Sequence, residues 1–156
     1  MERKKIDIRG VHDAGISTAI AEIQRRGGSA RRTGRLLAIA ASSDLPNLAD
    51  SVLAKVTAKT SGDWQTSVTY GRGRIAGDVA SKERYWIFVD LGTGPAQFYI
   101  APAIWVREEI LKRHEEFLLR NGGKRPINPD SVHHKIKAKW IAQWRQRWGL
   151  LGLPDE

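Results

Sequence analysis

Hydrophobic and polar residues alternate along the chain with two different periods, which separate predicted helices from predicted strands. In residues 11–26 the apolar positions recur every three or four residues, so we expect an amphipathic helix that ends at the following glycine pair. These positions are Ile16, Ala19, Ile20 and Ile23. Residues 104–121 repeat the same spacing, and residues 138–148 predict a last helix.

Shorter segments predict β-strands between these helices. The run at 36–41 is apolar throughout, and the segment 52–60 alternates between an apolar and a more polar face. After a turn at 61–63, the segment 64–70 alternates again, so we expect it to pair with 52–60 as a hairpin.

The segment 85–91 is the strongest strand, because it is apolar on both faces as central strands are. A short strand is expected at 98–100, and loops are expected at 71–80 and from 121 to His134.

This order of elements predicts an α/β fold with a mixed central β-sheet flanked by helices. At 156 residues, the chain fits a single domain. Within it, residues 1–120 would form the helix, the sheet and a covering helix, and residues 121–156 a basic loop and a C-terminal Trp-rich helix.

Composition excludes several classes of protein. The chain has no cysteine, which excludes disulfides, cysteine–zinc sites and thiol catalysis. No stretch approaches the roughly 18 apolar residues of a membrane helix, and the charged N-terminus lacks the apolar region of a signal peptide. We therefore expect a cytoplasmic protein with no membrane partner.

Charge points to a polyanionic partner. The chain holds 26 Lys and Arg against 17 Asp and Glu, a net charge of +9, and its pI of about 10.2 is typical of nucleic-acid-binding domains. The excess gathers in residues 22–35 and 120–147, and the glycine-rich stretch 71–74 adds a basic loop. The candidate nucleic-acid-binding residues are Arg31, Arg32, Arg35, Arg72, Arg74, Lys135, Lys137, Lys139, Arg145 and Arg147.

Three stretches carry a family resemblance: VTAKT at the end of 52–60, the SGDWQ that follows, and YWIFVDLGTGPAQFYIAP. Together with the helix before them, they resemble the restriction-endonuclease-like core of the PD-(D/E)XK superfamily. That resemblance implies Mg²⁺-assisted attack of water on a phosphodiester. It also implies an acidic residue on the second strand, and an acidic residue two positions before a lysine on the third.

The sequence departs from this pattern. Lys59 takes the lysine position, but Thr57 stands at the carboxylate position, Ala38 at the second-strand acid and Ile16 near a helical glutamate position. Lys59 and Thr57 are the remaining candidate catalytic positions. Either the metal site is degenerate, which we favour because Mg²⁺ needs carboxylates, or displaced acids hold the metal. The displaced candidates are Asp44, Asp50 and Asp63.

Two further motifs have competing interpretations. Trp140, Trp144 and Trp148 recur every four residues, so they would form one stripe that docks the last helix on the sheet rather than a platform for unpaired bases. His133 and His134 are expected to lie in a loop before that helix and to cap it, rather than to bind a metal.

The favoured hypothesis is a nucleic-acid-binding protein, most simply a DNA-binding one, on a nuclease-like fold with a degenerate metal site. A Mg²⁺-dependent endonuclease and a protein–protein interaction module remain as alternatives. Enzymes that cut both strands are frequently symmetric dimers, so a homodimer also stays open.

Overall fold

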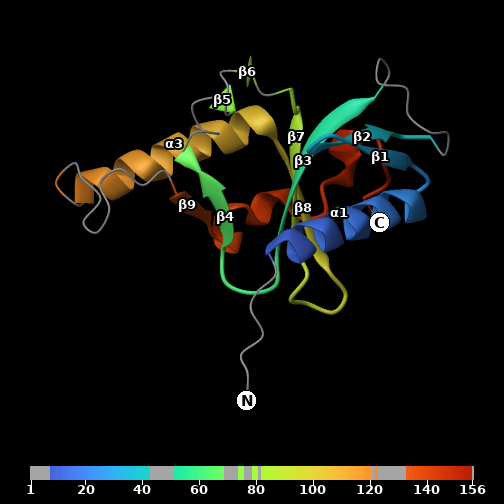
Figure 1. Ribbon diagram of the computed structural model, residues 1–156, viewed down its shortest axis with the longest axis horizontal. Helices are drawn as coiled ribbons and strands as arrows, with labels where there is room; N and C mark the ends of the chain where they lie inside the picture. Colours follow the sequence, from blue (N-terminus) through green and yellow to red (C-terminus); the bar gives the residue numbers. More distant parts are fainter. Residues whose placement is uncertain are drawn as a thin grey trace.

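The computed structural model describes residues 8–42, 51–68, 74–75, 79–80, 82–120, 122 and 133–155 (Figure 1). Five strands form one sheet: β1 (Ser29–Thr33), β2 (Leu36–Ala40), β3 (Val52–Lys59), β7 (Tyr85–Asp90) and β8 (Gln97–Pro102), in that order. Neighbours are antiparallel except β3 and β7, which run parallel. The predicted α/β class with a mixed sheet is confirmed, and β7 lies inside the sheet as its apolar sequence predicts.

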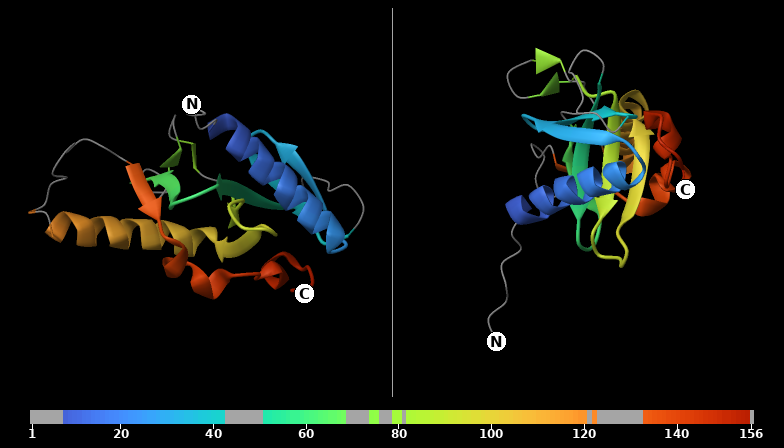
Figure 2. Two further views of the ribbon diagram at one scale, coloured as in Figure 1. Left: turned by 90° about the horizontal axis from the view of Figure 1, so that it is seen from below. Right: turned by 90° about the vertical axis from the view of Figure 1, so that its right-hand side faces the viewer.

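Two long helices cover opposite faces of this sheet (Figure 2). They are α1 (Ile8–Arg25) and α3 (Ala103–Arg120), which confirms both predicted helices with slightly shifted ends. α1 shares a buried cluster with Ile87, and α3 shares another with Trp86. Because adjacent residues of a strand point to opposite faces, β7 connects two separate cores.

A two-stranded antiparallel ribbon, β4 (Trp64–Ser67) with β9 (His133–Ile136), lies beside the main sheet. The predicted hairpin between 52–60 and 64–70 is therefore wrong. Both edges of β3 are already paired, with β2 on one side and β7 on the other, so β4 has no edge to join.

Trp64 explains where β4 goes instead. Its indole is fully buried, makes an edge-on contact with Phe88, and donates a hydrogen bond to the carbonyl oxygen of Val89 at 3.1 Å. Burying this ring beneath β7 draws β4 away from β3. It also places β4 against the α3 side of the sheet, where Ile136 of β9 joins the same cluster.

Four short strands lie where the sequence pattern predicted none. β1 comes directly after α1 and forms a hairpin with β2. In the expected loop at 71–80, β5 (Arg74–Ile75) pairs with β6 (Val79–Ala80). The expected loop up to His134 gives way to β9 at its end.

The predicted helix at 138–148 is wrong: this segment forms separate 3₁₀ turns, η2 (Ala138–Trp140), η3 (Ala142–Trp144) and η4 (Trp148–Leu151). Between η3 and η4 the chain crosses the edge of β8, where Gln146 donates its backbone N–H to the Phe98 carbonyl at 3.0 Å. Gln146 has a φ of 56°, which an α-helix does not accommodate.

The crossing separates Trp148 from Trp144. Trp148 is fully buried in the cluster beneath α1, whereas Trp144 packs against the cluster beneath α3. The prediction that these two rings dock on the sheet is thus confirmed. They dock on opposite faces, however, and do not form one helical stripe.

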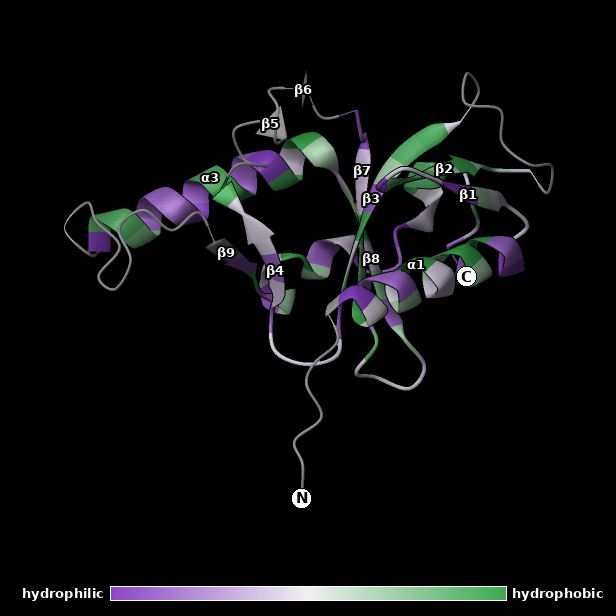
Figure 3. Cartoon of the chain, viewed as in Figure 1, coloured by the Kyte–Doolittle hydropathy of each residue, from purple (hydrophilic) through white to green (hydrophobic). Residues whose placement is uncertain are grey.

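Hydropathy follows these layers. Figure 3 shows mostly hydrophobic ribbon on β2 and β3, and hydrophilic bands that alternate with hydrophobic ones along α3. Among the described residues, no helix has the length and apolar character needed to cross a membrane.

Candidate functional site

The face of β3 that points away from the α1 cluster presents three polar side chains in a row. Ala54 and Val56 are buried in the cluster beneath α1, so the alternating Lys55, Thr57 and Lys59 point to the other face of the sheet. This confirms the two faces predicted for the segment 52–60. A strand thereby presents two ammonium groups and a hydroxyl on one side.

Helix α1 packs unusually close to the end of β3. Gly15 faces Ala58, and a Cβ added to Gly15 would overlap the Ala58 Cβ. About one helical turn before this contact, Val11 and His12 reach the same cleft as the polar face of β3. A glycine at this position therefore lets the helix bring His12 to the site.

Lys59 is held from two sides. Its Nζ lies 3.2 Å from Oδ2 of Asp90, the residue directly beside it in the parallel pairing of β3 with β7. The same Nζ lies 4.7 Å from the centre of the Trp64 ring. The two charged side chains are only 12% and 16% exposed. Lys59 is thus a partly buried, paired lysine.

Asp90 is itself fixed by the turn that follows it. Its Oδ1 accepts a hydrogen bond from the backbone N–H of Gly92 at 2.9 Å. One carboxylate therefore orients both the lysine and the turn after β7. No pattern in the sequence pairs Asp90 with Lys59, although Asp90 is the only acidic residue within the apolar 85–91 segment.

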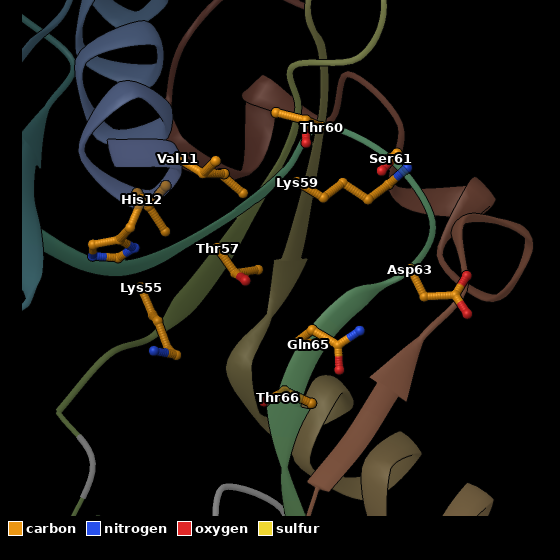
Figure 4. Close-up of a pocket in the computed structure, with 12 residues that line it drawn as sticks. Val11, His12, Lys55, Thr57, Lys59, Thr60, Ser61, Asp63, Gln65 and Thr66 are labelled. Carbon is orange, nitrogen blue, oxygen red and sulfur yellow. The ribbon is translucent and has the colours of Figure 1, made fainter. Parts of the chain in front are cut away.

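These side chains line a cleft of about 520 Å³ between β3 and β4, which we name the β3 cleft (Figure 4). Its polar lining consists of His12, Lys55, Thr57, Lys59, Thr60, Ser61, Asp63, Gln65 and Thr66. In Figure 4, Thr57 points into the space between the two strands and Asp63 points away from it. The cleft is rich in hydrogen-bond donors.

His12 has a perturbed titration. Partial burial, followed by the positive charges of Lys55 and Arg32, lowers its pKa below the usual value, while Asp13 opposes the shift. His12 is therefore neutral at neutral pH, and it gains a positive charge inside the cleft on acidification.

The residues around Lys59 do not fit a Mg²⁺ site. Thr57 and the fully buried Ala38 supply no carboxylate, and Asp90 is bound to Lys59. Within the described residues, no group of three His, Asp or Glu side chains lies close enough to hold a metal. Asp63 is the one proposed ligand in the described ranges, and Asp44 and Asp50 lie outside them.

A second cleft of about 560 Å³, the α3 cleft, lies between α3 and the segment from β9 to η2. Three of the predicted nucleic-acid-binding residues line it, namely Lys135, Lys137 and Lys139, and all three are exposed. Arg120 and Arg113 of α3 form the opposite wall with Glu116. The structure thus gathers part of the basic C-terminal cluster around one hollow.

The remaining predicted basic residues lie elsewhere. Arg31 points to the same face of the sheet as Lys55, because it is the register partner of Ala38. Arg32 points to the other face, where its Nη1 lies 3.0 Å from Asp13, and Arg35 is exposed at the β1–β2 turn. These arginines border α1 and β1 and do not enter the α3 cleft.

Arg145 and Arg147 are exposed at the edge of β8, and neither lines the two clefts. Arg147 donates to the Gln143 carbonyl at 3.0 Å. Arg74 belongs to β5, and Arg72 lies outside the described residues. Neither cleft is therefore lined by Arg31, Arg32, Arg35, Arg145 or Arg147.

His134 belongs to β9 and is buried, so the expectation that it caps a following helix is wrong. The strand pairing with β4 replaces the loop, and no α-helix follows it in the described residues up to 155. His133 lies at the start of the same strand.

Comparison of the sequence with protein-family models, with curated proteins and with solved structures gave no match.

Proposed function

We propose that this chain is a nucleic-acid-binding protein on a restriction-endonuclease-like core whose metal site is degenerate. The order of elements supports the core: α1 precedes the apolar β2, β3 ends at Lys59, and the aromatic β7 lies beside it. This is the order on which the sequence resemblance rests.

Lys55, Thr57 and Lys59 carry the proposal, because one strand face directs them into a single cleft. Ammonium groups and hydroxyls are the side chains that hold phosphate oxygens in protein–nucleic acid contacts. An ammonium has three donors, so Lys59 can hold Asp90 and a phosphate oxygen at the same time. Thr57, Thr60 and Ser61 add hydroxyl donors along the same wall.

The side chains around Lys59 favour binding of a nucleic acid rather than its cleavage, because they lack the carboxylates of a hydrolytic site. A hydrolytic site of the kind that the resemblance implies needs carboxylates at the positions of Thr57 and Ala38. Thr57 lines the cleft without a charge, and the fully buried Ala38 adds none nearby, which favours an anionic backbone. The net charge of +9 acts in the same direction over a longer range.

The test measures the affinity for a fluorescently labelled DNA oligonucleotide by anisotropy. We expect binding to weaken by orders of magnitude when salt rises from about 50 to 200 mM. The Lys55→Gln variant should weaken binding by about tenfold, since it removes a charge-assisted hydrogen bond to phosphate. Lys82→Gln is the matched control, because Lys82 is exposed outside the cleft.

The same protein is then incubated with plasmid in Mg²⁺, in Mn²⁺ and in chelator. Unchanged plasmid in every sample is the expected result. Metal-dependent cutting that disappears in Lys59→Ala would show that the chain is an endonuclease instead. Absence of any DNA binding at low salt would favour a role in binding an acidic protein partner.

A further inference from the structure

The β3 cleft and the α3 cleft lie on either side of one structural element. Gln65 and Thr66 of β4 line the β3 cleft, whereas His134 and Lys135 of β9 line the α3 cleft. β4 and β9 are adjacent strands of the same ribbon, and adjacent strands lie about 5 Å apart. The two clefts are therefore neighbours separated by the width of a single ribbon.

The surface of this ribbon is polar at the crossing point. Gln65 is paired directly opposite Lys135, so both side chains point to the same face, and both are exposed. Their neighbours Trp64 and Ile136 are buried and point inwards. A polyanion that ran from one cleft to the other would thus pass from the amide of Gln65 in the β3 cleft to the ammonium of Lys135 in the α3 cleft.

The α3 cleft combines positive charge with aromatic rings. Lys135, Lys137 and Lys139 occupy every second position of the segment that leads from β9 into η2, and all three are exposed. Trp140 and Phe117 are half-buried in the same lining. The guanidinium of Arg113 lies 4.4 Å from the centre of the Trp140 ring. Cations beside aromatic rings are the components of sites that bind unpaired bases.

From this arrangement we infer that the two clefts and the β4–β9 ribbon form one path for a single-stranded polynucleotide. The inference rests on the proposed function of the β3 cleft and adds the strandedness of its ligand. Volumes of about 520 and 560 Å³ match sites for small molecules, which suits separate nucleotides. A duplex keeps its bases paired inside, so Trp140 and Phe117 would gain no stacking partner from it.

The test compares anisotropy titrations of labelled oligothymidylates of about 4 and about 16 nucleotides with a duplex of the same length as the longer strand. The expected order is that the longer strand binds at least tenfold more tightly than either the short strand or the duplex. An oligouridylate of the longer length shows whether RNA follows the same path as DNA.

The variant Lys137→Gln/Lys139→Gln tests the second half of the path. It should weaken binding of the longer strand by about tenfold. The negative slope of log affinity against log salt concentration should become shallower by about 0.7 for each phosphate that the variant no longer neutralises. Trp140→Leu should weaken binding at least fivefold, and Trp140→Phe should retain most of it. The control Lys82→Gln/Lys112→Gln removes the same charge from exposed sites outside both clefts.

Three results would overturn the inference, and they separate it from the proposed function. If Lys55→Gln weakens binding but Lys137→Gln/Lys139→Gln behaves as its control, the β3 cleft binds alone. If the duplex binds as tightly as the long strand, the ligand is not single-stranded. If no oligonucleotide of any kind binds, the proposed function itself fails.

Discussion

Lys59 and Asp90 are direct partners in the parallel pairing of β3 with β7, and their charged atoms lie 3.2 Å apart in a partly buried corner. Asp90 thus lowers the positive charge of the β3 cleft while it fixes the position of the ammonium group. The pair therefore stabilises this end of the sheet and, at the same time, reduces the positive charge that is available to a bound anion.

Asp90→Asn should change stability and affinity in opposite directions. The amide oxygen keeps the bond from the Gly92 N–H, but the ion pair is removed, so the free energy of unfolding should fall by about 1 to 2 kcal/mol. Freed from its partner, Lys59 should bind an oligonucleotide several times more tightly. Urea unfolding and anisotropy measure the two effects.

Asp63→Asn is the matched control for this substitution. Asp63 lines the same cleft, so the variant removes the same charge, whereas the carboxylate that pairs with Lys59 is that of Asp90. Equal losses of stability in both variants would contradict a specific role for the Lys59–Asp90 pair.

His12 should make binding depend on pH. Burial and the charges of Lys55 and Arg32 lower its pKa from the usual 6.5, so the side chain is neutral at pH 7 and takes up a proton only at lower pH. A bound phosphate favours the protonated form, and affinity should therefore rise about three- to tenfold as the pH falls through this lowered pKa. Anisotropy across pH measures this rise.

The His12→Gln variant should remove this rise while it keeps a polar side chain of similar length. If wild type and His12→Gln gave parallel pH profiles, His12 would not face the bound anion.

Gly15→Ala should destabilise the contact between α1 and β3. The new methyl group would overlap the Ala58 Cβ, and overpacking of this kind costs about 1 to 3 kcal/mol. Thermal or urea unfolding gives the change. Ser17→Ala, on an exposed position of the same helix, should leave stability nearly unchanged.

A second substitution tests the cause. Ala58→Gly in the Gly15→Ala background should recover part of the lost stability, since it removes the other methyl group. An additive loss in the double variant would show that the two residues do not clash.

Gln146 should affect the stability of the C-terminal segment through both its side chain and its backbone. Its Oε1 accepts the indole N–H of the buried Trp148 at 2.7 Å, and its φ of 56° lies in the left-handed region. Gln146→Ala should lower the free energy of unfolding by about 2 kcal/mol, because a buried donor loses its partner and the strain remains.

Gln146→Gly loses the same hydrogen bond but adopts the positive φ without a Cβ penalty, so it should be about 1 kcal/mol more stable than Gln146→Ala. Urea unfolding of both variants checks the order. If alanine proved equal to glycine, the backbone conformation would contribute nothing.

Much of the fold could be predicted because it depends on local periodicity. The helical spacing of Ile16, Ala19 and Ile23 predicted α1, and period-two alternation placed Lys55, Thr57 and Lys59 on one face of β3. Both patterns arise from the geometry of a single element, so neighbouring chain segments do not alter them. The strand β7 was predicted from another local signal, a short run that is apolar on both faces.

The errors concern segments whose structure depends on distant partners. The alternation in segment 64–70 predicts a strand, but it does not predict the strand's partner. β4 pairs with β9 because β3 has no free edge and because the Trp64 ring is buried beneath β7. The spacing of Trp144 and Trp148 is helical, yet the chain crosses the edge of β8 between them, and each ring enters a different core.

By itself, the sequence determined the positive charge, the α/β pattern and the polar face of β3, since these follow from composition and from residues two to four positions apart. Only the tertiary structure decided that Asp90 pairs with Lys59, because the register of two parallel strands depends on the long connection between them. It also decided that Lys135 lies opposite Gln65, which brings the α3 cleft beside the β3 cleft. Both arrangements depend on contacts between residues far apart in the chain, so no local sequence pattern predicts them.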